Sequence, residues 1–267
     1  METVTSSDGT KIGFERSGSG PSLVLVHGAS ASAMRWGNIR PMLDKHFTVI
    51  AMDRRGRGGS GDIAPGATYA LEREYDDVAA VVAKAEGPVV LFGHSYGGLC
   101  SLGAMPMLER VSALIIYEAP VPEGPLLPEE LLARLNDAAR RDDREGIMKM
   151  FCEEVVRMRP ADIAALRASP AWPARLEAAH TIPREMLAVE SFSLVATHPE
   201  RLEIPTLLLH GGDSPDFFKT SMARIADAIP RAISIALDGQ QHVAMDTAPE
   251  MLTQTVTRFW NEVSRSG

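Results

Sequence analysis

Cysteine is scarce in this sequence, and long apolar stretches are missing. The cysteines are Cys100 and Cys152, which are too few for a disulfide framework, and we expect both to be buried thiols. No apolar stretch reaches about 18 residues, the length that a transmembrane helix requires. The amino-terminal residues also lack the basic region and apolar stretch of a secretion signal. We therefore expect a soluble, cytoplasmic protein with no membrane partner.

Positive charge is also in short supply. The chain has 27 Lys and Arg residues against 35 Asp and Glu residues, which gives a formal net charge of −8. An acidic chain is poorly suited to bind the phosphate backbone of a nucleic acid or an anionic membrane surface. No Cys and His residues have the spacing of a zinc site, and the glycine-lysine motif of a phosphate-binding P-loop is absent. The sequence therefore indicates no nucleic-acid partner, no metal and no nucleotide.

Short apolar runs alternate with segments of helical periodicity along most of the chain. Most of the runs are typical of central parallel strands covered on both faces, and an Asp-Gly pair between the first two strands indicates a hairpin. This alternation predicts a doubly wound, mostly parallel sheet of the α/β class. The predicted strands are Val4–Ser6, Lys11–Arg16, Leu23–Val26, Phe47–Ala51, Val89–Phe92, Ala113–Tyr117, Thr206–Leu209 and Ala232–Ala236. The predicted helices among them are Trp36–Leu43, Glu72–Ala85, Tyr96–Leu108, Ser221–Ala228 and Pro249–Val263.

The alternation stops after residue 117. From about residue 120 to residue 201 there is no strand-like run, and prolines separate helical stretches, since proline favours the first turn of a helix and breaks its interior. We expect a helical cap at residues 121–200, inserted into a core that consists of residues 1–120 and 201–267. The methionines and aromatic residues of this cap either pack its helices together or line an apolar pocket. They are Met148, Met150, Phe151, Met158, Trp172, Met186 and Phe192.

The most informative segment is residues 93–97, which read GHSYG directly after an apolar run. Glycine two residues before and after a serine, between a strand and a helix, is typical of a sharp turn that holds the serine hydroxyl clear of the backbone. The following helix presents free N–H groups and the positive end of its dipole to a developing oxyanion. We therefore interpret Ser95 as a nucleophile. The alternative is a glycine-rich turn with a structural role only.

A serine hydroxyl needs a base that accepts its proton. His242 is the best candidate, because it lies in a glycine-containing loop after the last predicted strand, and such loops share one edge of a parallel sheet. A surface histidine without a chemical role is the alternative. An oxyanion hole needs two N–H groups, which we expect from Tyr96, next to the nucleophile, and from Ala29, in the turn after the Leu23–Val26 strand.

Together these segments resemble the α/β-hydrolase superfamily, in particular its capped serine esterases and lactonases. The matching segments are HGA at residues 27–29, DRRGRGGSG at 53–61, GHSYGG at 93–98, and the late His242. The resemblance spans nearly the whole chain except the cap, and the order nucleophile, acid, histidine is that of the family. It implies an eight-stranded α/β-hydrolase fold and no cofactor. Dehalogenases and epoxide hydrolases of this fold are expected to use an aspartate where this chain has Ser95.

The acid of the triad is where the sequence departs from the family pattern. The family usually carries an aspartate three residues after the glycine that ends the strand at Thr206–Leu209, and that position is Ser214 here. Asp213 lies one residue earlier. Some related lactonases and dehalogenases carry the acid at the end of the preceding strand, where Glu118 stands 23 residues after Ser95. We favour Glu118, which follows an apolar run and needs a partner when ionised, with Asp213 as the alternative.

Three arginines, Arg54, Arg55 and Arg57, lie close together in the second of the matching segments. Such a cluster resembles a phosphate-binding patch. The likeness to the family instead makes it a structural loop near the site, with direct ligand contact as the alternative.

The residues and the resemblance together predict a serine hydrolase that cleaves a small to medium hydrophobic ester or lactone through an acyl-enzyme. His242 would deprotonate Ser95, Glu118 would orient the imidazole, and the N–H groups of Ala29 and Tyr96 would receive the oxyanion. A cofactor-free perhydrolase or a carbon–carbon bond hydrolase with the same triad is one alternative, and a ligand-binding member of the fold without turnover is another. The expected partner is a small-molecule substrate, and the sequence indicates no oligomeric state.

Overall fold

One eight-stranded sheet forms the centre of the computed structural model, which describes residues 1–122 and 124–266. The strand order is β1-β2-β4-β3-β5-β6-β7-β8. The pairs β1–β2 and β2–β4 are antiparallel, and all other neighbouring strands are parallel. The strands are β1 (Glu2–Thr5), β2 (Lys11–Gly18), β3 (Ser22–Val26), β4 (Thr48–Met52), β5 (Val89–His94), β6 (Val111–Tyr117), β7 (Thr206–Gly211) and β8 (Ala232–Leu237). The predicted α/β sheet, with eight mostly parallel strands, is confirmed.

The centre of the sheet contains a reversal of strand order. β3 lies between β4 and β5. After β3 the chain forms β4 on one side of it and then crosses to form β5 on the other side. In open α/β sheets, ligands bind beside such a reversal, at the carboxyl ends of the strands. The turns after β3 and β5, which contain residues 27–29 and Ser95, therefore lie where the topology favours a site.

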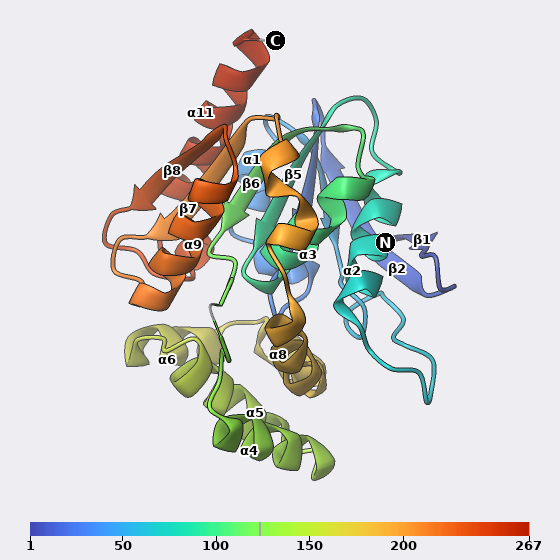
Figure 1. Ribbon diagram of the computed structural model, residues 1–267, viewed down its shortest axis with the longest axis vertical. Coiled ribbons are helices and arrows are strands. Elements are labelled where there is room, and N and C mark those ends of the chain that lie inside the picture. The colour runs from blue at the N-terminus through green and yellow to red at the C-terminus, as the bar shows by residue number, and fades with distance from the viewer. Residues whose placement is uncertain (123, 267) are drawn as a thin grey trace.

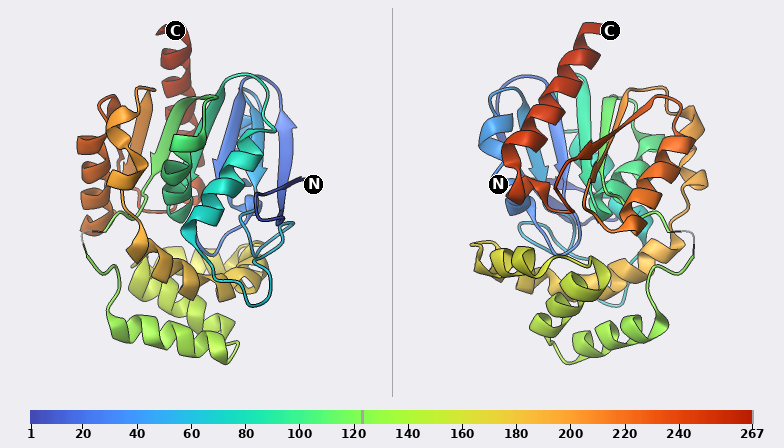
Figure 2. Two further views of the ribbon diagram at one scale, coloured as in Figure 1. Left: turned by 45° about the vertical axis from the view of Figure 1, so that its right-hand side comes forward. Right: turned by 90° about the vertical axis from the view of Figure 1, so that its left-hand side faces the viewer.

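Successive strand residues pack into two separate apolar clusters, one on each face of the sheet. Leu91 belongs to one cluster and its neighbour Val90 to the other, because side chains along a strand alternate between faces. Figure 2 shows α2 and α3 on one face and α11 on the other. The first cluster packs against α2 (Leu71–Val82), α3 (Tyr96–Ala104) and α9 (Asp216–Ala228), and the second against α1 (Arg40–Leu43) and α11 (Pro249–Ser266).

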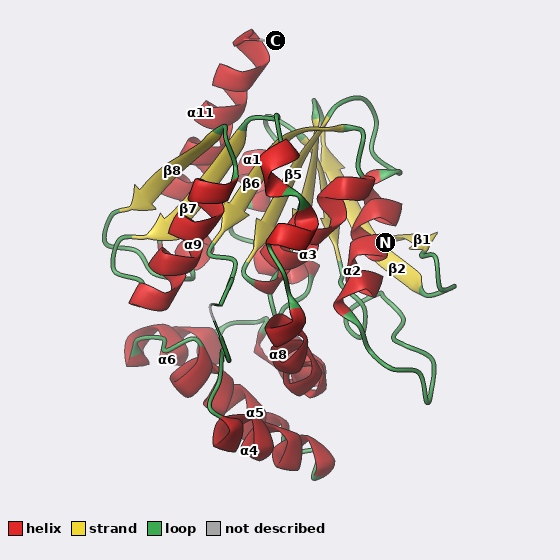
Figure 3. Ribbon diagram, in the orientation of Figure 1, coloured by secondary structure: helices red, strands yellow, loops and turns green. Residues whose placement is uncertain are grey.

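The segment between β6 and β7 is helical, and we call it the helical insert. Its helices lie together beyond the carboxyl ends of the parallel strands, whose arrowheads point toward them (Figures 1 and 3). A single π-helical turn at Phe151–Val155 continues α5. The helices are α4 (Glu129–Arg140), α5 (Arg144–Met150), α6 (Pro160–Ala168), α7 (Trp172–Ala178) and α8 (Ile182–Ser191), with short 3₁₀ turns after α7 and α8.

The helices differ from the predicted ones at several boundaries, and the two largest differences at an amino-terminal end involve a proline. The predicted helix at residues 36–43 is split into a 3₁₀ turn (Ala33–Trp36) and α1. Pro41 occupies the first turn of α1, and because proline cannot donate an intrahelical hydrogen bond, it begins a new helix here. α9 begins at Asp216, five residues earlier than predicted, directly after Pro215.

Both cysteines are free and buried, as predicted. Burial raises the pKa of each thiol, so neither has the character of a reactive thiolate. Within residues 1–122 and 124–266, no helix combines the length and apolar character needed to cross a membrane.

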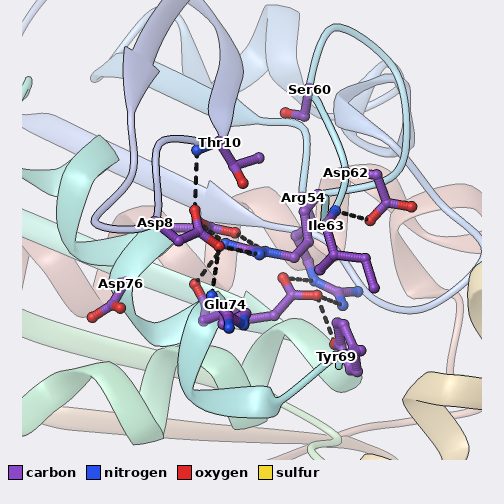
Figure 4. A network of polar contacts seen from close by, with 12 residues as sticks. Asp8, Thr10, Arg54, Ser60, Asp62, Ile63, Tyr69, Glu74 and Asp76 are labelled. Carbon is purple, nitrogen blue, oxygen red and sulfur yellow. Dashed lines mark hydrogen bonds and ion pairs between the residues drawn. The ribbon is translucent and has the colours of Figure 1, made fainter. Parts of the chain in front are cut away.

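The clustered arginines Arg54, Arg55 and Arg57 are buried, and each is paired with at least one carboxylate. Arg54 pairs with Glu74 on α2, a contact drawn in Figure 4, at 2.7 Å. It also lies 3.0 Å from Glu185 on α8 of the helical insert. Arg57 pairs with the same Glu185. The loop therefore connects the sheet to the insert through fully buried ion pairs, which favours its interpretation as a structural loop.

This network predicts the effect of one substitution. Glu185→Gln removes the carboxylate that two buried guanidinium groups share, so we expect it to lower the free energy of unfolding by about 3 kcal/mol. Glu190→Gln, at an exposed position of the same helix, is the matched control and should change stability by less than about 0.5 kcal/mol. Urea denaturation of the three proteins measures the difference. Equal midpoints for all three would contradict the anchoring role.

Candidate active site

Ser95 occupies a strained turn between β5 and α3. Its backbone angles are φ 55° and ψ −127°, a combination that residues other than glycine rarely adopt. The Ser95 N–H donates to the carbonyl of Tyr117 (2.8 Å), and the Ser95 carbonyl accepts from the N–H of Gly98 (2.8 Å). These bonds hold the serine at the carboxyl edge of the sheet, on the sharp turn that the sequence predicted.

The glycines on either side of Ser95 are required by close packing. A Cβ on Gly93 would lie 2.5 Å from Ser101 Oγ, and a Cβ on Gly97 would overlap the carbonyl oxygen of Val26 at the end of β3. No side chain fits at either position without moving backbone. The turn can therefore approach β3 closely only because both residues are glycine.

His242 and Glu118 are joined by a buried hydrogen bond. His242 Nδ1 lies 2.6 Å from Glu118 Oε2, and the other carboxylate oxygen of Glu118 accepts the N–H of Gly211 (2.7 Å). Glu118 is fully buried and has a positive φ of 49°, and its own N–H donates to the carbonyl of Leu209. Both carboxylate oxygens therefore have donors, which is what a buried carboxylate requires.

The loop that carries His242 is held on several sides. Tyr117 donates its hydroxyl hydrogen to the carbonyl of Gln241 and accepts the N–H of Ala244 (3.2 Å). His94 Nε2 donates to the carbonyl of His242 itself (2.9 Å). The ring of Phe218 stacks on the imidazole, with centroids 4.2 Å apart and an interplanar angle of 14°. The imidazole is thus fixed in position and orientation before any ligand binds.

The histidines of the two glycine-containing turns, His27 and His94, have structural hydrogen bonds. His27 donates from Nδ1 to the carbonyl of Gly28 (2.8 Å) and accepts the N–H of Arg54 at Nε2 (3.0 Å). Burial, followed by nearby positive groups, holds the pKa of both histidines well below the ordinary value. Both rings are therefore neutral at physiological pH.

Ser95 and His242 line the same narrow cavity, whose volume is about 30 Å³. An adjoining pocket of about 480 Å³ opens beside it and shares part of its wall. The helical insert supplies much of the lining of the narrow cavity: Phe151, Cys152, Val156, Met158, Leu166 and Arg175. Of the methionines and aromatic residues considered from sequence, Phe151 and Met158 line it.

The turn after β3 lies directly against Ser95. A Cβ on Gly28 would come within 2.8 Å of the Ser95 Cβ, and Ala29 lines the narrow cavity. Among the described residues, no acceptor takes the N–H of Ala29 or that of Tyr96. The Tyr96 side chain is buried elsewhere, with its hydroxyl 2.8 Å from that of Tyr69 and its ring 4.3 Å from the Arg54 guanidinium. Two free N–H groups therefore flank the serine.

The alternative acid, Asp213, is bonded to the His242 loop through its backbone. Its N–H donates to the carbonyl of Gln240 (2.9 Å), and its carbonyl accepts from Gln241 Nε2 (2.8 Å). No hydrogen bond joins its carboxylate to His242 in the part of the chain that the structure describes. The structure thus brings Ser95, His242 and Ala29 to one cavity with Glu118 behind the imidazole.

Two arginines of the cavity wall, Arg35 and Arg175, were missed from the sequence. Neither arginine lies in one of the sequence motifs that identified the other candidate site residues. Arg175 is a single cation in a short helix, and its direction depends on how the insert packs over the sheet. Within residues 1–122 and 124–266, no group of three or more His, Cys, Asp or Glu side chains is placed to hold a metal ion.

Comparisons with known proteins agree with this geometry. The sequence model of the alpha/beta hydrolase family matches residues 23–255. The chain therefore belongs to the alpha/beta hydrolase family. A crystal structure of an alpha/beta hydrolase from Sphaerobacter thermophilus superimposes with a TM-score of 0.83 at 35% identity, covering 97% of this chain and all of that one.

Curated relatives are more distant. The pimeloyl-[acyl-carrier protein] methyl ester esterase of Aeromonas salmonicida is 26% identical over 261 residues, covering 93% of this chain and 98% of that protein. A probable oxidoreductase, EphD, of Mycobacterium tuberculosis is 33% identical over 114 residues. That match covers 41% of this chain and only 19% of the length of EphD.

The packing around Ser95 predicts a second substitution. Gly97→Ala places a methyl group against the carbonyl of Val26, so we expect a loss of about 2 kcal/mol or more in the free energy of unfolding. Gly124→Ala is the control, because a Cβ there meets no atom within 4 Å. Chemical denaturation compares both variants with the wild type. If Gly97→Ala is as stable as the control, the close approach of the turn to β3 is wrong.

Proposed function

We propose that this chain is a serine hydrolase in which Ser95 is the nucleophile, His242 the general base and Glu118 the acid. The observation that carries the proposal is the buried hydrogen bond between Glu118 and His242, behind a cavity that His242 lines together with Ser95. A base that is oriented by a third group, next to a nucleophile on a strained turn, is the arrangement that activates a serine hydroxyl.

The reaction proceeds in two steps. His242 Nε2 takes the proton of Ser95 as Oγ attacks the carbonyl carbon, and the N–H groups of Ala29 and Tyr96 stabilise the oxyanion. Glu118 holds the imidazole through Nδ1 and stabilises the imidazolium that forms. The imidazolium then protonates the leaving alkoxide. Water, deprotonated by His242, then attacks the acyl carbon, and the imidazolium returns the proton to Ser95 Oγ as the bond from that carbon to Oγ breaks and the carboxylic acid leaves.

The helical insert, residues 121–200, acts as a cap on the core formed by residues 1–120 and 201–267. The narrow cavity beside Ser95 measures about 30 Å³, and the adjoining pocket of about 480 Å³, which the insert also lines, offers space for the rest of the substrate. Phe151, Val156, Met158 and Leu166 give the cavity an apolar wall. This wall suits a small to medium hydrophobic acyl group in an ester or a lactone.

Hydrolysis of a panel of ethyl esters, from acetate to octanoate, and of five- and six-membered lactones tests the proposal. Ser95→Ala should lower kcat/KM by about 10⁴-fold or more, and Glu118→Gln by about 10³- to 10⁴-fold. Asp213→Asn is the matched acid control and should stay within about threefold of the wild type. Thermal melting of each variant shows that the fold is intact.

Each contradicting result has a distinct meaning. Activity that survives Ser95→Ala would overturn the nucleophile. A loss in Asp213→Asn with activity kept in Glu118→Gln would move the acid to Asp213. A wild type that binds esters and returns them unhydrolysed would contradict hydrolysis itself and favour a ligand-binding role.

A further inference from the structure

Arg175 brings a buried positive charge to the candidate active site. It lies on α7 of the helical insert, is 7% exposed, and lines both the narrow cavity with Ser95 and the adjoining pocket of about 480 Å³. Its Nη1 donates to the carbonyl oxygen (3.0 Å) and hydroxyl oxygen (3.3 Å) of Ser30. Its Nε is buried and has no hydrogen-bond partner among the described residues. The guanidinium therefore has unused donor capacity inside the site.

No carboxylate in the described part of the chain lies within ion-pair distance of Arg175. The other buried arginines differ in this respect, since Arg54, Arg55 and Arg57 are all paired with acids. An unpaired buried cation is costly, and removing the partner of a buried pair typically costs about 3–5 kcal/mol. A chain that pairs its other buried guanidinium groups leaves this one open toward the cavity.

The electrostatic surroundings of Arg175 are positive. Arg35 lines the same cavity, and none of the Asp and Glu residues that the structure describes does, although the whole chain has a net charge of −8. Asp246 borders the adjoining pocket, but its carboxylate is paired with Arg35. Burial, and then the charge of Arg35, lower the pKa of Arg175 to about 9, so the guanidinium is still cationic at neutral pH. Arg175 therefore lacks a negative charge at ion-pair distance among the described residues.

We propose that a carboxylate on the substrate supplies that charge, and that Arg175 binds it. The inference deepens the proposed function and rests on it. The substrate class is then an ester or lactone that carries a free carboxylate, such as a monoester of a dicarboxylic acid. Apolar side chains contact the methylene chain, and the guanidinium binds the far end with charge-assisted hydrogen bonds. Binding there also excludes water from the buried charge.

A second role for Arg175 has to be separated from this one. Its hydrogen bonds to Ser30 hold the turn that follows Ala29, so a substitution also affects the oxyanion hole. A loss of positioning lowers kcat for every ester alike. A loss of carboxylate binding lowers kcat/KM for anionic esters, mainly through KM, and spares neutral ones. The ratio of the two specificity constants therefore reports the proposed role alone.

The experiment compares monoethyl esters of succinic, glutaric, adipic and pimelic acids with ethyl esters of alkanoic acids of the same length, assayed by pH-stat. We expect the wild type to prefer one or more of the monoesters. Arg175→Gln should lower the ratio of anionic to neutral kcat/KM by about 10- to 100-fold, and Arg175→Lys should restore part of it. Arg140→Gln, an exposed arginine paired with Asp137, is the matched control and should leave the ratio unchanged.

A binding measurement makes the test independent of turnover. Calorimetric titration of Ser95→Ala with the same monoesters should give a Kd about 10- to 100-fold lower than that of the Ser95→Ala, Arg175→Gln double variant. Neutral esters should bind both proteins equally. Melting curves identify a variant that fails to fold, in which case Arg175→Lys carries the comparison.

The outcomes separate the two proposals. Hydrolysis of neutral esters with no preference for monoesters, or a ratio unchanged in Arg175→Gln, would overturn carboxylate recognition and leave the serine hydrolase intact. An equal loss on both ester types would assign Arg175 to positioning and also overturn it. If no ester is hydrolysed but monoesters bind Ser95→Ala through Arg175, the proposed function fails and carboxylate binding stands.

Discussion

The hydrogen bond between Glu118 and His242 is the contact on which the rest of the site depends. It joins residues 124 positions apart, and it forms because β6, β7 and β8 are neighbours in one parallel sheet. Glu118 follows β6, Gly211 ends β7 and donates to the carboxylate, and His242 lies in the loop after β8. A buried carboxylate is stable here only because both of its oxygens have donors. The sheet topology thus sets the chemistry at its edge.

Buried arginines divide the helical insert into two functional regions. Arg54 and Arg57 reach Glu185 on α8 and attach one side of the insert to the core through charges that are satisfied within the protein. Arg175 on α7 lines the cavity with no described acid at ion-pair distance, and it is the residue that we propose binds a ligand carboxylate. We infer that the attached side resists displacement, while the walls formed by α5, α6 and α7 admit and recognise substrate. Stability and specificity are then separate properties of one insert.

Strands and the turn around Ser95 could be predicted from the sequence, because nearby residues determine them. The choice of the acid could not, because it depends on which distant segments meet. Unbroken apolar runs such as Val89–Phe92 identified the strands, and the glycines around Ser95 identified the turn. Helix boundaries at Pro41 and Pro215 were missed because a proline marks both the end of one segment and the start of another. Local sequence left Glu118 and Asp213 open as acids, since strand register decides which carboxylate faces His242. Arg175 carried no signal, because its direction depends on how the insert packs.

The most direct test of the central claim is the rate at which a fluorophosphonate modifies the protein, followed by peptide mapping. Such reagents form a covalent bond with an activated serine and need no knowledge of the substrate. The account predicts a single adduct on Ser95 in the wild type, and labelling slowed by about 10³-fold in Glu118→Gln, where the imidazole loses its orienting carboxylate. Modification at another serine, or Ser95 labelled equally fast in both proteins, would contradict it.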